Sequence, residues 1–284
     1  MTNKLTDITV IILTKNEEND IGRCVQSVAG WVRRIVVVDS GSTDRTTDIA
    51  KDLGVEVVTH EPFLDYAKQF NWAIDNLNIQ TTWVFRLDAD EVVTPELRKE
   101  LEKELEHHAT DDVSGFMMRY KVSFLGRYLK HGGFYPFLKI TIFKYGKGRF
   151  EDRAMGEHIV LSEGRCIDLK NDAIHYAFKS IDQYVLKHNW YATREVQDYF
   201  DVRSGRENAL LDGQPERAKK LRDGLYYRLP MFLRAKLFFW YRYYLRLGFL
   251  DGTPGYIFAF LQAYWYRTLV DAKIYERNLN KDDK

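Results

Sequence analysis

Short apolar runs and amphipathic segments alternate along the first hundred residues of this 284-residue chain. Residues 8–14, 34–39 and 83–87 are rich in β-branched or aromatic side chains, and residues 55–59 form a shorter run of the same kind. Such runs are typical of strands buried on both faces of a parallel sheet. Helical spacing, with Ser, Thr or Asp at the start, occurs in the segments between them: 20–29, 44–53 and 65–77. This order predicts an α/β fold in which helices cover both faces of a mostly parallel, Rossmann-like sheet.

The pattern changes after about residue 110. Strand-like segments give way to a helix, then to a polar stretch over 203–220 that has the composition of a linker or lid, and finally to an aromatic tail. We expect the tail to form two helices separated by a turn at 252–255. The chain is therefore expected to consist of one main domain with a C-terminal helical appendage.

Charge and cysteine content limit the possible classes of protein. The chain has 42 Lys and Arg against 41 Asp and Glu, so no overall positive field attracts nucleic acid. Cys24 and Cys166 fit neither a zinc site nor a disulfide scaffold, which favours a reducing cytoplasm. The first predicted strand starts at Ile8, which leaves no room for a signal peptide, and no apolar run is long enough to span a membrane. We expect a cytoplasmic protein that binds no nucleic acid.

Acidic residues follow three of the predicted strands. Glu17 comes after the first strand, Asp39 ends the second, and Asp88 and Asp90 follow the fourth. The carboxyl ends of parallel strands share one edge of a sheet, where ligands bind, so these side chains are expected to converge. Asp88 and Asp90 also project to the same side because side chains alternate along a strand. Two such carboxylates suit Mg²⁺ or Mn²⁺ carrying phosphate oxygens, and a solvated strand end before a helix start is the alternative.

Three motifs that occur in order carry a family resemblance: Thr14–Glu17 (TKNE), Val38–Asp44 (VDSGSTD) and Leu87–Glu91 (LDADE). Together they resemble the signatures of family 2 glycosyltransferases with the GT-A fold, in particular the bacterial β-glycosyltransferases of lipopolysaccharide-core and surface-polysaccharide assembly. The resemblance implies an inverting transfer of a sugar from a nucleotide-diphosphate donor, linked to UDP, to a hydroxyl of a glycolipid or oligosaccharide acceptor. It also implies Mn²⁺ or Mg²⁺ as cofactor. No glycine-rich phosphate loop follows any strand, so a bound nucleotide needs such an ion.

The resemblance divides the chain into functional parts. We expect a GT-A domain over 1–224, composed of a nucleotide-binding half (1–110) and an acceptor-side half (111–224), followed by the C-terminal segment (225–284).

The same resemblance implies which residues contact the donor. Asp39 would accept a hydrogen bond from the donor base, Thr14 and Glu17 would line the nucleoside pocket, and Asp88 would lie near the ribose. The full set expected to bind the nucleotide sugar is Thr14, Asn16, Glu17, Asp39, Ser40, Gly41, Lys68, Asn71, Asp88, Ala89 and Asp90. For the two members on the predicted helix at 65–77, a solvated helix face is the alternative.

The expected metal ligands are Asp90, Asp88 and His175. Asp90 is the direct ligand implied by the resemblance. His175 is included because GT-A enzymes often take a further metal or diphosphate contact from a histidine beyond the acceptor segment. A histidine packed in the core is the alternative.

An inverting transfer needs a base that takes the proton of the acceptor hydroxyl. The resembled family has a His-Glu pair at the place where this chain reads Gly156-Glu157-His158. Because the histidine is displaced, we expect Glu157 to be the base, with Asp152 as the second candidate. A segment with a purely structural role is the alternative.

The C-terminal tail has its own composition. From Tyr226 to Leu250 it contains no acidic residue and five basic ones among many aromatic side chains. Helices of this kind lie in membrane interfaces, where cations meet anionic lipid. We expect peripheral attachment to the cytoplasmic face of the inner membrane, which would suit a glycolipid acceptor. A helix pair packed on the main domain, or on a second copy in a homo-oligomer, is the alternative.

Two other functions stay open at this point. One is a non-catalytic nucleotide-sugar-binding scaffold in a polysaccharide assembly complex. The other is a nucleotidyltransferase, which would be expected to have a glycine-rich basic loop where this chain has Thr14–Glu17.

Overall fold

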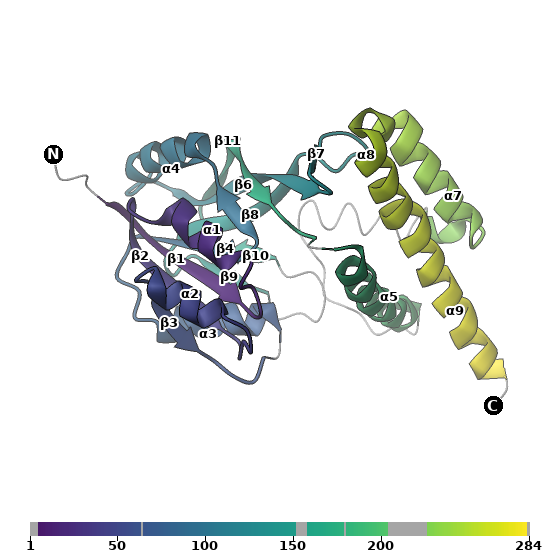
Figure 1. Ribbon diagram of the computed structural model, residues 1–284, viewed down its shortest axis with the longest axis horizontal. Helices are drawn as coiled ribbons and strands as arrows, with labels where there is room; N and C mark the ends of the chain where they lie inside the picture. The colour runs from purple at the N-terminus through teal and green to yellow at the C-terminus, as the bar shows by residue number, and fades with distance from the viewer. Residues whose placement is uncertain (1–4, 64, 152–157, 179, 204–225, 283–284) are drawn as a thin grey trace. The chain divides into compact units, whose positions relative to one another are not determined.

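A computed structural model describes residues 5–63, 65–151, 158–178, 180–203 and 226–282 (Figure 1). The chain divides into two compact units. Unit 1 comprises Met1–Val122 and Pro136–Ala177, and unit 2 comprises Ser123–Tyr135 and Phe178–Lys284. The domain boundary expected at 224/225 falls among residues that the structure does not describe.

Unit 1 contains most of the strands, and the residue bounds follow the predicted segments closely. Its elements are β1 (Thr6–Thr14), α1 (Ile21–Val28), β2 (Val32–Asp39), α2 (Thr46–Asp52), β3 (Glu56–Thr59), α3 (Tyr66–Asn76), β4 (Trp83–Asp88), β5 (Glu91–Val93), α4 (Pro95–His107), β6 (Val113–Phe124), β8 (Phe137–Lys144), β9 (Gly148–Phe150), β10 (Ile159–Leu161) and β11 (Arg165–His175).

The strands of unit 1 lie in the order β3-β2-β1-β4-β8-β6-β11-β5. The first four are parallel to one another, which confirms the predicted α/β sheet. Beyond β4 the sheet is mixed: β8 is antiparallel to β4 and β6, and β5 is antiparallel to β11. Strand β11 is parallel to β6, and α4, which lies between β5 and β6 in the chain, contacts β11. Strands β9 and β10 pair with each other in a separate small sheet.

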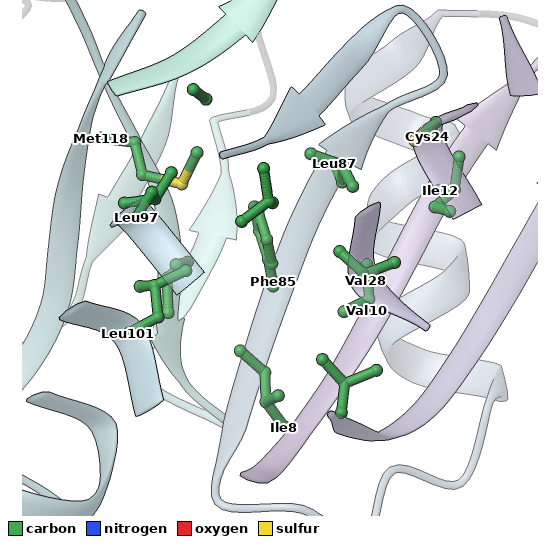
Figure 2. Close-up of a cluster of buried hydrophobic side chains, with 14 of the residues drawn as sticks. Ile8, Val10, Ile12, Cys24, Val28, Phe85, Leu87, Leu97, Leu101 and Met118 are labelled. Atoms are coloured by element: carbon green, nitrogen blue, oxygen red, sulfur yellow. The ribbon is translucent and has the colours of Figure 1, made fainter. Parts of the chain in front are cut away.

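Each face of the parallel half has its own core. One buried cluster joins alternate residues of β1, β2 and β4 to α1, α2 and α4. Figure 2 shows part of this cluster: Ile8, Val10 and Ile12 of β1, Phe85 and Leu87 of β4, Cys24 and Val28 of α1, and Leu97 and Leu101 of α4. The intervening strand residues, such as Ile11 and Val38, pack with α3 on the other face. Burial on both faces explains why these strands read as continuous apolar runs.

Unit 2 contains β7 and the helices of the C-terminal half. Its elements are β7 (Arg127–Leu129), α5 (Ile181–Arg203), η1 (Tyr226–Arg228), α7 (Leu233–Trp240), the π-helical turn η2 (Tyr241–Leu245), η3 (Gly248–Asp251), α8 (Gly252–Ala259), the π-helical turn η4 (Phe260–Trp265) and α9 (Tyr266–Asp282).

The turn predicted at 252–255 is wrong. These residues form the start of α8, where Pro254 is tolerated because first-turn N–H groups have no partner within the helix. The chain reverses just before, at Leu247 with φ of 59° and at Gly248, where a Cβ would lie 3.0 Å from the carbonyl of Arg242.

Candidate active site

The carboxyl ends of β1, β2 and β4 lie side by side at one edge of the sheet. Thr14 is in register with Asp39 of β2, and Leu13 is in register with Asp88 of β4. Neighbouring strands are about 4.8 Å apart, so the backbones at Asp39 and Asp88 lie roughly 10 Å apart on the two sides of β1. By alternation, Asp39 leaves the sheet on the face of α1 and Asp88 on the face of α3. Two acids therefore flank the end of one strand.

Hydrogen bonds join the loops that follow β1 and β2. The backbone N–H of Asn16 donates to Ser42 Oγ at 2.8 Å, and its side-chain carbonyl accepts from the N–H of Thr43 at 2.8 Å. The N–H of Glu17 donates to Thr46 Oγ1 at 2.7 Å. Asn16 has a φ of 57°, a left-handed conformation that Asn adopts more readily than most residues. The two loops thus hold each other in a fixed shape.

Asp39 holds the turn after β2 with its own carboxylate. Oδ2 accepts from the N–H groups of Gly41 (3.0 Å) and Ser42 (2.9 Å), and Oδ1 accepts from the Ser42 hydroxyl (2.5 Å). Its exposed fraction is only 2%. Gly41 has φ of 80°, a left-handed conformation that favours glycine.

Thr14 and Ser40 complete this side of the edge. The N–H of Ser40 donates to the carbonyl of Thr14 at 3.0 Å, and both residues are 4% exposed. Within the described part of the chain, Thr14 Oγ1 has no hydrogen-bond partner. A buried hydroxyl without a partner costs free energy.

Asp88 is held by two cations. Arg86 Nη2 lies 2.7 Å from its Oδ1, and Lys139 Nζ of β8 lies 3.4 Å from its Oδ2. Lys139 Nζ also lies 2.6 Å from Oε1 of Glu91, whose side chain is 1% exposed. The hydroxyl of Tyr120 donates to Glu91 Oε2 at 3.1 Å. The five residues form one charge network at the base of the site.

Burial and charge together set the protonation of this network. Burial by itself would raise the pKa of Asp88, but Arg86 and Lys139 lower the pKa below its ordinary value. For Glu91 burial prevails, and its pKa is raised although Lys139 is close. Burial disfavours a charged Lys139, but Glu91 and Asp88 raise its pKa above that of a free lysine. At neutral pH, Asp88 is thus an anion that protein cations already balance.

Asp90 faces a histidine from a different strand. His175 ends β11, in register with Glu91 of β5, and its Nε2 lies 3.3 Å from Oδ2 of Asp90. The N–H of Tyr176 donates to the carbonyl of Asp90 at 2.9 Å. The Asp90 and His175 side chains are 21% and 19% exposed. Ala89 is 3% exposed and packs in the core, which anchors the turn between β4 and β5.

A divalent ion fits the pair formed by Asp90 and His175. Oδ2 of Asp90 and Nε2 of His175 lie 3.3 Å apart, so one ion could contact both. A carboxylate oxygen suits Mg²⁺ or Mn²⁺, and a neutral imidazole nitrogen is a common metal ligand. Among the described residues, no group of three or more His, Cys, Asp or Glu side chains forms a metal cluster. Asp90 and His175 are thus two described side chains in contact that could ligate an ion, while Asp88 is engaged by Arg86 and Lys139.

The family model described as Glycosyl transferase family 2 matches residues 9–159, which is more than half of the chain. The chain belongs to this family. It is a glycosyltransferase with the GT-A fold, as the three motifs predicted, and the match spans the strand ends described above.

Relatives of similar length also match this glycosyltransferase. The lipopolysaccharide core biosynthesis glycosyltransferase LpsC of Rhizobium meliloti is 27% identical over 96% of this chain and 94% of the relative. An uncharacterized glycosyltransferase of Rickettsia prowazekii is 29% identical over 97% of this chain and 91% of the relative. Among solved structures, glucosyl-3-phosphoglycerate synthase from Mycobacterium tuberculosis is similar with a TM-score of 0.33 and 21% identity. That match covers 41% of this chain and 44% of the synthase chain.

In this glycosyltransferase, the two expected donor residues on α3 have different surroundings. Lys68 is exposed, and its Nζ lies 3.3 Å from the carboxylate of Asp65, the N-cap of the helix. Asn71 is engaged on both sides with Phe150: Nδ2 donates to its carbonyl at 3.1 Å, and Oδ1 accepts from its N–H at 3.0 Å. Asn71 thereby ties α3 to β9.

Both candidates for the base of this glycosyltransferase, Asp152 and Glu157, lie outside the described residues. The residues that border this segment are described. The N–H of Glu151 donates to the carbonyl of His158 at 3.2 Å, next to the β9–β10 pairing of Phe150 with Ile159.

Sequence reasoning missed Arg86, Lys139 and Tyr120. For Arg86 a signal existed: it lies two residues before Asp88 on a strand, so both side chains project to one side. Lys139 and Tyr120 come from β8 and β6, which reach the site only through sheet pairing that no local pattern reveals.

Proposed function

We propose that this glycosyltransferase is metal-dependent and inverting, and that it moves a sugar from a UDP-linked donor to a saccharide acceptor of lipopolysaccharide, capsule or another surface glycan. The observation that carries the proposal is the contact between Asp90 and His175, 3.3 Å apart, beside the balanced carboxylate of Asp88. Direct displacement at the anomeric carbon inverts its configuration and needs no protein nucleophile.

The donor nucleoside is proposed to bind at the ends of β1 and β2. The hydroxyl of Thr14, which has no hydrogen-bond partner among the described residues, and the carboxylate of Asp39, which also holds the turn after β2, are the groups proposed to contact the base and ribose. Asn16 and Gly41 fix the shape of the two loops. Preformed loops lose little entropy when a ligand binds, which favours this edge as the nucleoside site.

Asp90 and His175 would hold Mn²⁺ or Mg²⁺, and Asp88 would lie next to the ion. When bound, the ion neutralises the leaving diphosphate, a contribution of several kcal/mol to transition-state stabilisation. The contribution of the protein side chains is to hold the proposed ligands in place. Arg86 and Lys139 keep Asp88 ionised and fixed, so the turn that carries Asp90 keeps its shape.

The transfer then needs only a proton acceptor from the protein. We assign this role to Glu157, with Asp152 as the alternative. The acceptor hydroxyl oxygen forms a bond to the anomeric carbon, the bond from that carbon to the diphosphate oxygen breaks, and the proton passes to the carboxylate.

A saccharide acceptor attached to a lipid is proposed on two grounds. One is the similarity to LpsC, a glycosyltransferase of lipopolysaccharide core biosynthesis. The other is the surface of unit 2, where Trp240, Tyr244 and Leu245 are 51%, 51% and 59% exposed in a segment without acids. In the part of the chain that the structure describes, no helix meets the length and hydropathy of a membrane span. From the exposed aromatic residues and the lack of acids in this segment, we propose peripheral association with the cytoplasmic face of the inner membrane.

A panel of nucleotide sugars, incubated with and without Mn²⁺, tests the proposal by the release of nucleoside diphosphate. We expect a single UDP-sugar to turn over, only in the presence of the ion. Turnover in the presence of a chelator would show that transfer does not depend on a metal ion. Turnover of a sugar linked to another nucleotide would show that the donor is not a UDP-sugar. Donor binding without any turnover would support a scaffold role instead.

The base assignment has its own test. Glu157→Gln should lower turnover by about 10²-fold or more and leave donor affinity unchanged, because the base acts only on the acceptor. The matched variant Asp152→Asn should stay within about threefold of wild type. The opposite ranking of the two variants assigns the base to Asp152.

A further inference from the structure

Two arginines of unit 2 lack acidic partners. Arg242 lies in η2, and Arg246 follows directly after it. Within the described ranges, neither guanidinium makes a hydrogen bond or an ion pair. The charged group of Arg242 lies 4.2 Å from the ring centroid of Phe134 and 4.9 Å from that of Phe238. Rings provide only a partial substitute for an anion, so the charge of Arg242 is stacked but not neutralised.

Two other arginines of the same unit have acidic partners. Arg234 donates from Nε to Asp271 Oδ1 at 2.8 Å, and both side chains are 1% exposed. Arg267 Nη1 lies 2.6 Å from Glu195 Oε1. Arg234 and Arg267 thus have acidic partners, whereas the half-buried Arg242 has none among the described residues, and an anion from outside would supply one.

Asp251, which ends η3, binds the loop between β7 and β8. Its Oδ2 accepts from the N–H groups of Lys130 (2.9 Å) and His131 (2.8 Å), and its Oδ1 lies 2.8 Å from His131 Nδ1. The N–H of Gly132 also donates to the carbonyl of Arg246 at 2.8 Å. These bonds fix the loop against η2 and η3 and leave no carboxylate for the arginines.

The fixed loop brings both guanidinium groups to one place. Arg246 Nε lies 3.4 Å from where a Cβ on Gly133 would be, while Arg242 stacks on Phe134, the next residue of the loop. Gly133 has φ of 74° and is exposed, so no side chain of its own covers the spot. The guanidinium groups of Arg246 and Arg242 therefore lie next to two consecutive residues of this loop, Gly133 and Phe134.

The charge balance around Arg242 is unfavourable as it stands. Burial, together with repulsion from Arg267 and Arg246, lowers the pKa of Arg242 to about 10. An anion between the two guanidinium groups would remove this penalty. A phosphate group fits because its oxygens accept the paired N–H donors that an arginine presents in a plane.

We propose that Arg242 and Arg246, at the Gly133 edge of the loop, form a binding site for a phosphate group. Two sources share this chemistry: a phosphate ester on the saccharide acceptor, and the headgroup of an anionic phospholipid. The inference deepens the proposed function by naming an anionic group that the acceptor or its membrane carries, and it rests on that function only for this interpretation.

The test measures phosphate binding without donor or metal, so it is independent of transfer. Inorganic phosphate is titrated into the full chain at constant ionic strength. Wild type is compared with Arg242→Gln/Arg246→Gln and with the control Arg228→Gln/Lys236→Gln, which removes two exposed charges from the same unit. The first variant should bind phosphate at least about tenfold more weakly, since it loses the charge-assisted bonds, and the control should change by less than about twofold.

Two further experiments distinguish a lipid headgroup from a phosphorylated saccharide as the source of the phosphate group. Sedimentation with vesicles of equal parts phosphatidylcholine and phosphatidylglycerol that depends on Arg242 and Arg246 assigns the site to a lipid headgroup. Competition by glucose 6-phosphate, with vesicle binding unchanged in the variant, assigns it to a phosphorylated saccharide. If the double glutamine variant does not fold, Arg246→Gln alone decides, because Arg246 is exposed.

Equal phosphate affinity in the arginine variant and the control would overturn the inference, and so would a wild-type chain that binds neither phosphate nor anionic vesicles. If sugar transfer is intact in that case, only this inference fails. If phosphate binds as expected but no donor turns over, the proposed function fails and the anion site stands.

Discussion

The strand edge of unit 1 and the arginine pair of unit 2 place charge in opposite ways. At the edge, Asp88 is balanced by Arg86 and Lys139, and Asp90 Oδ2 lies 3.3 Å from Nε2 of His175. In unit 2, Asp251 binds the loop between β7 and β8, Asp271 pairs with Arg234, and Arg242 is stacked on the ring of Phe134. One region thus suits an additional cation and the other an additional anion.

The difference shows why paired and unpaired charges carry different information. A buried pair such as Arg234 with Asp271 is complete and serves the fold. A charge that the surrounding structure holds in place but does not neutralise points to a ligand.

The largest effect is expected for Arg234→Met. It leaves the Asp271 carboxylate buried, with the N–H of Phe232 (2.7 Å) as its remaining described donor. We expect the free energy of unfolding to fall by about 3–5 kcal/mol, measured by urea denaturation. In Arg234→Met/Asp271→Leu no charge is left unpaired, so the loss should be less than half as large. A double variant as unstable as the single one would contradict the assignment of a complete pair.

A smaller loss is expected for Lys139→Met in unit 1. Glu91 and Asp88 lose a cation, but Arg86 still faces Asp88 and the lysine side chain is 18% exposed. The free energy of unfolding should fall by about 2 kcal/mol, and Lys139→Met/Glu91→Gln should recover part of it. If Lys139→Met is as stable as wild type in urea, the charge network does not hold the site.

Asn71→Ala tests whether the link between α3 and β9 matters for stability and turnover. The variant loses both hydrogen bonds to the backbone of Phe150, so stability should fall by about 1–2 kcal/mol. Turnover should fall more than donor affinity, because β9 leads into the segment of the proposed base. Asn76→Ala, which removes one exposed bond to Trp72 on the same helix, is the matched control. Equal effects of the two variants would show that Asn71 has no special role.

The smallest effect concerns pH and His188. Its ring stacks on Tyr184 at 3.7 Å, and burial, with Lys187 nearby, lowers its pKa below the value of about 6.5 in an unfolded chain. The folded state therefore binds fewer protons than the unfolded state as pH falls through that value, and stability decreases toward acid. Wild type should lose a few degrees of Tm between about pH 7 and pH 5 beyond what His188→Gln loses. Parallel pH profiles of the two proteins would contradict this.

The parallel half of the fold could be predicted because each of its strands is buried on both faces and reads as an apolar run. The helix starts were equally legible: Asp65 and Thr94 cap α3 and α4 as their sequence positions suggest. The path of residues 226–265 could not be predicted in this way. The composition of this segment does not show where π-helical and 3₁₀ turns interrupt its helices, since packing decides this.

For the candidate site, sequence could place acids at strand ends but not their partners. In the motif, Asp88 and Asp90 look equivalent. In the structure, Asp88 contacts Arg86 and Lys139, whereas Asp90 contacts His175. Lys139 and His175 lie far from the motif in sequence and reach it through β8 and β11. Only pairing across the sheet makes the two acids different.

The most direct test of the account is the affinity for Mn²⁺ in the presence of UDP, measured by calorimetry on wild type, Asp90→Asn and the exposed control Asp52→Asn. We predict that wild type and the control bind the ion alike and that Asp90→Asn binds it about 10²-fold more weakly, because it loses a charged ligand. Unchanged affinity in Asp90→Asn would contradict the claim that a divalent ion joins this strand edge to the donor.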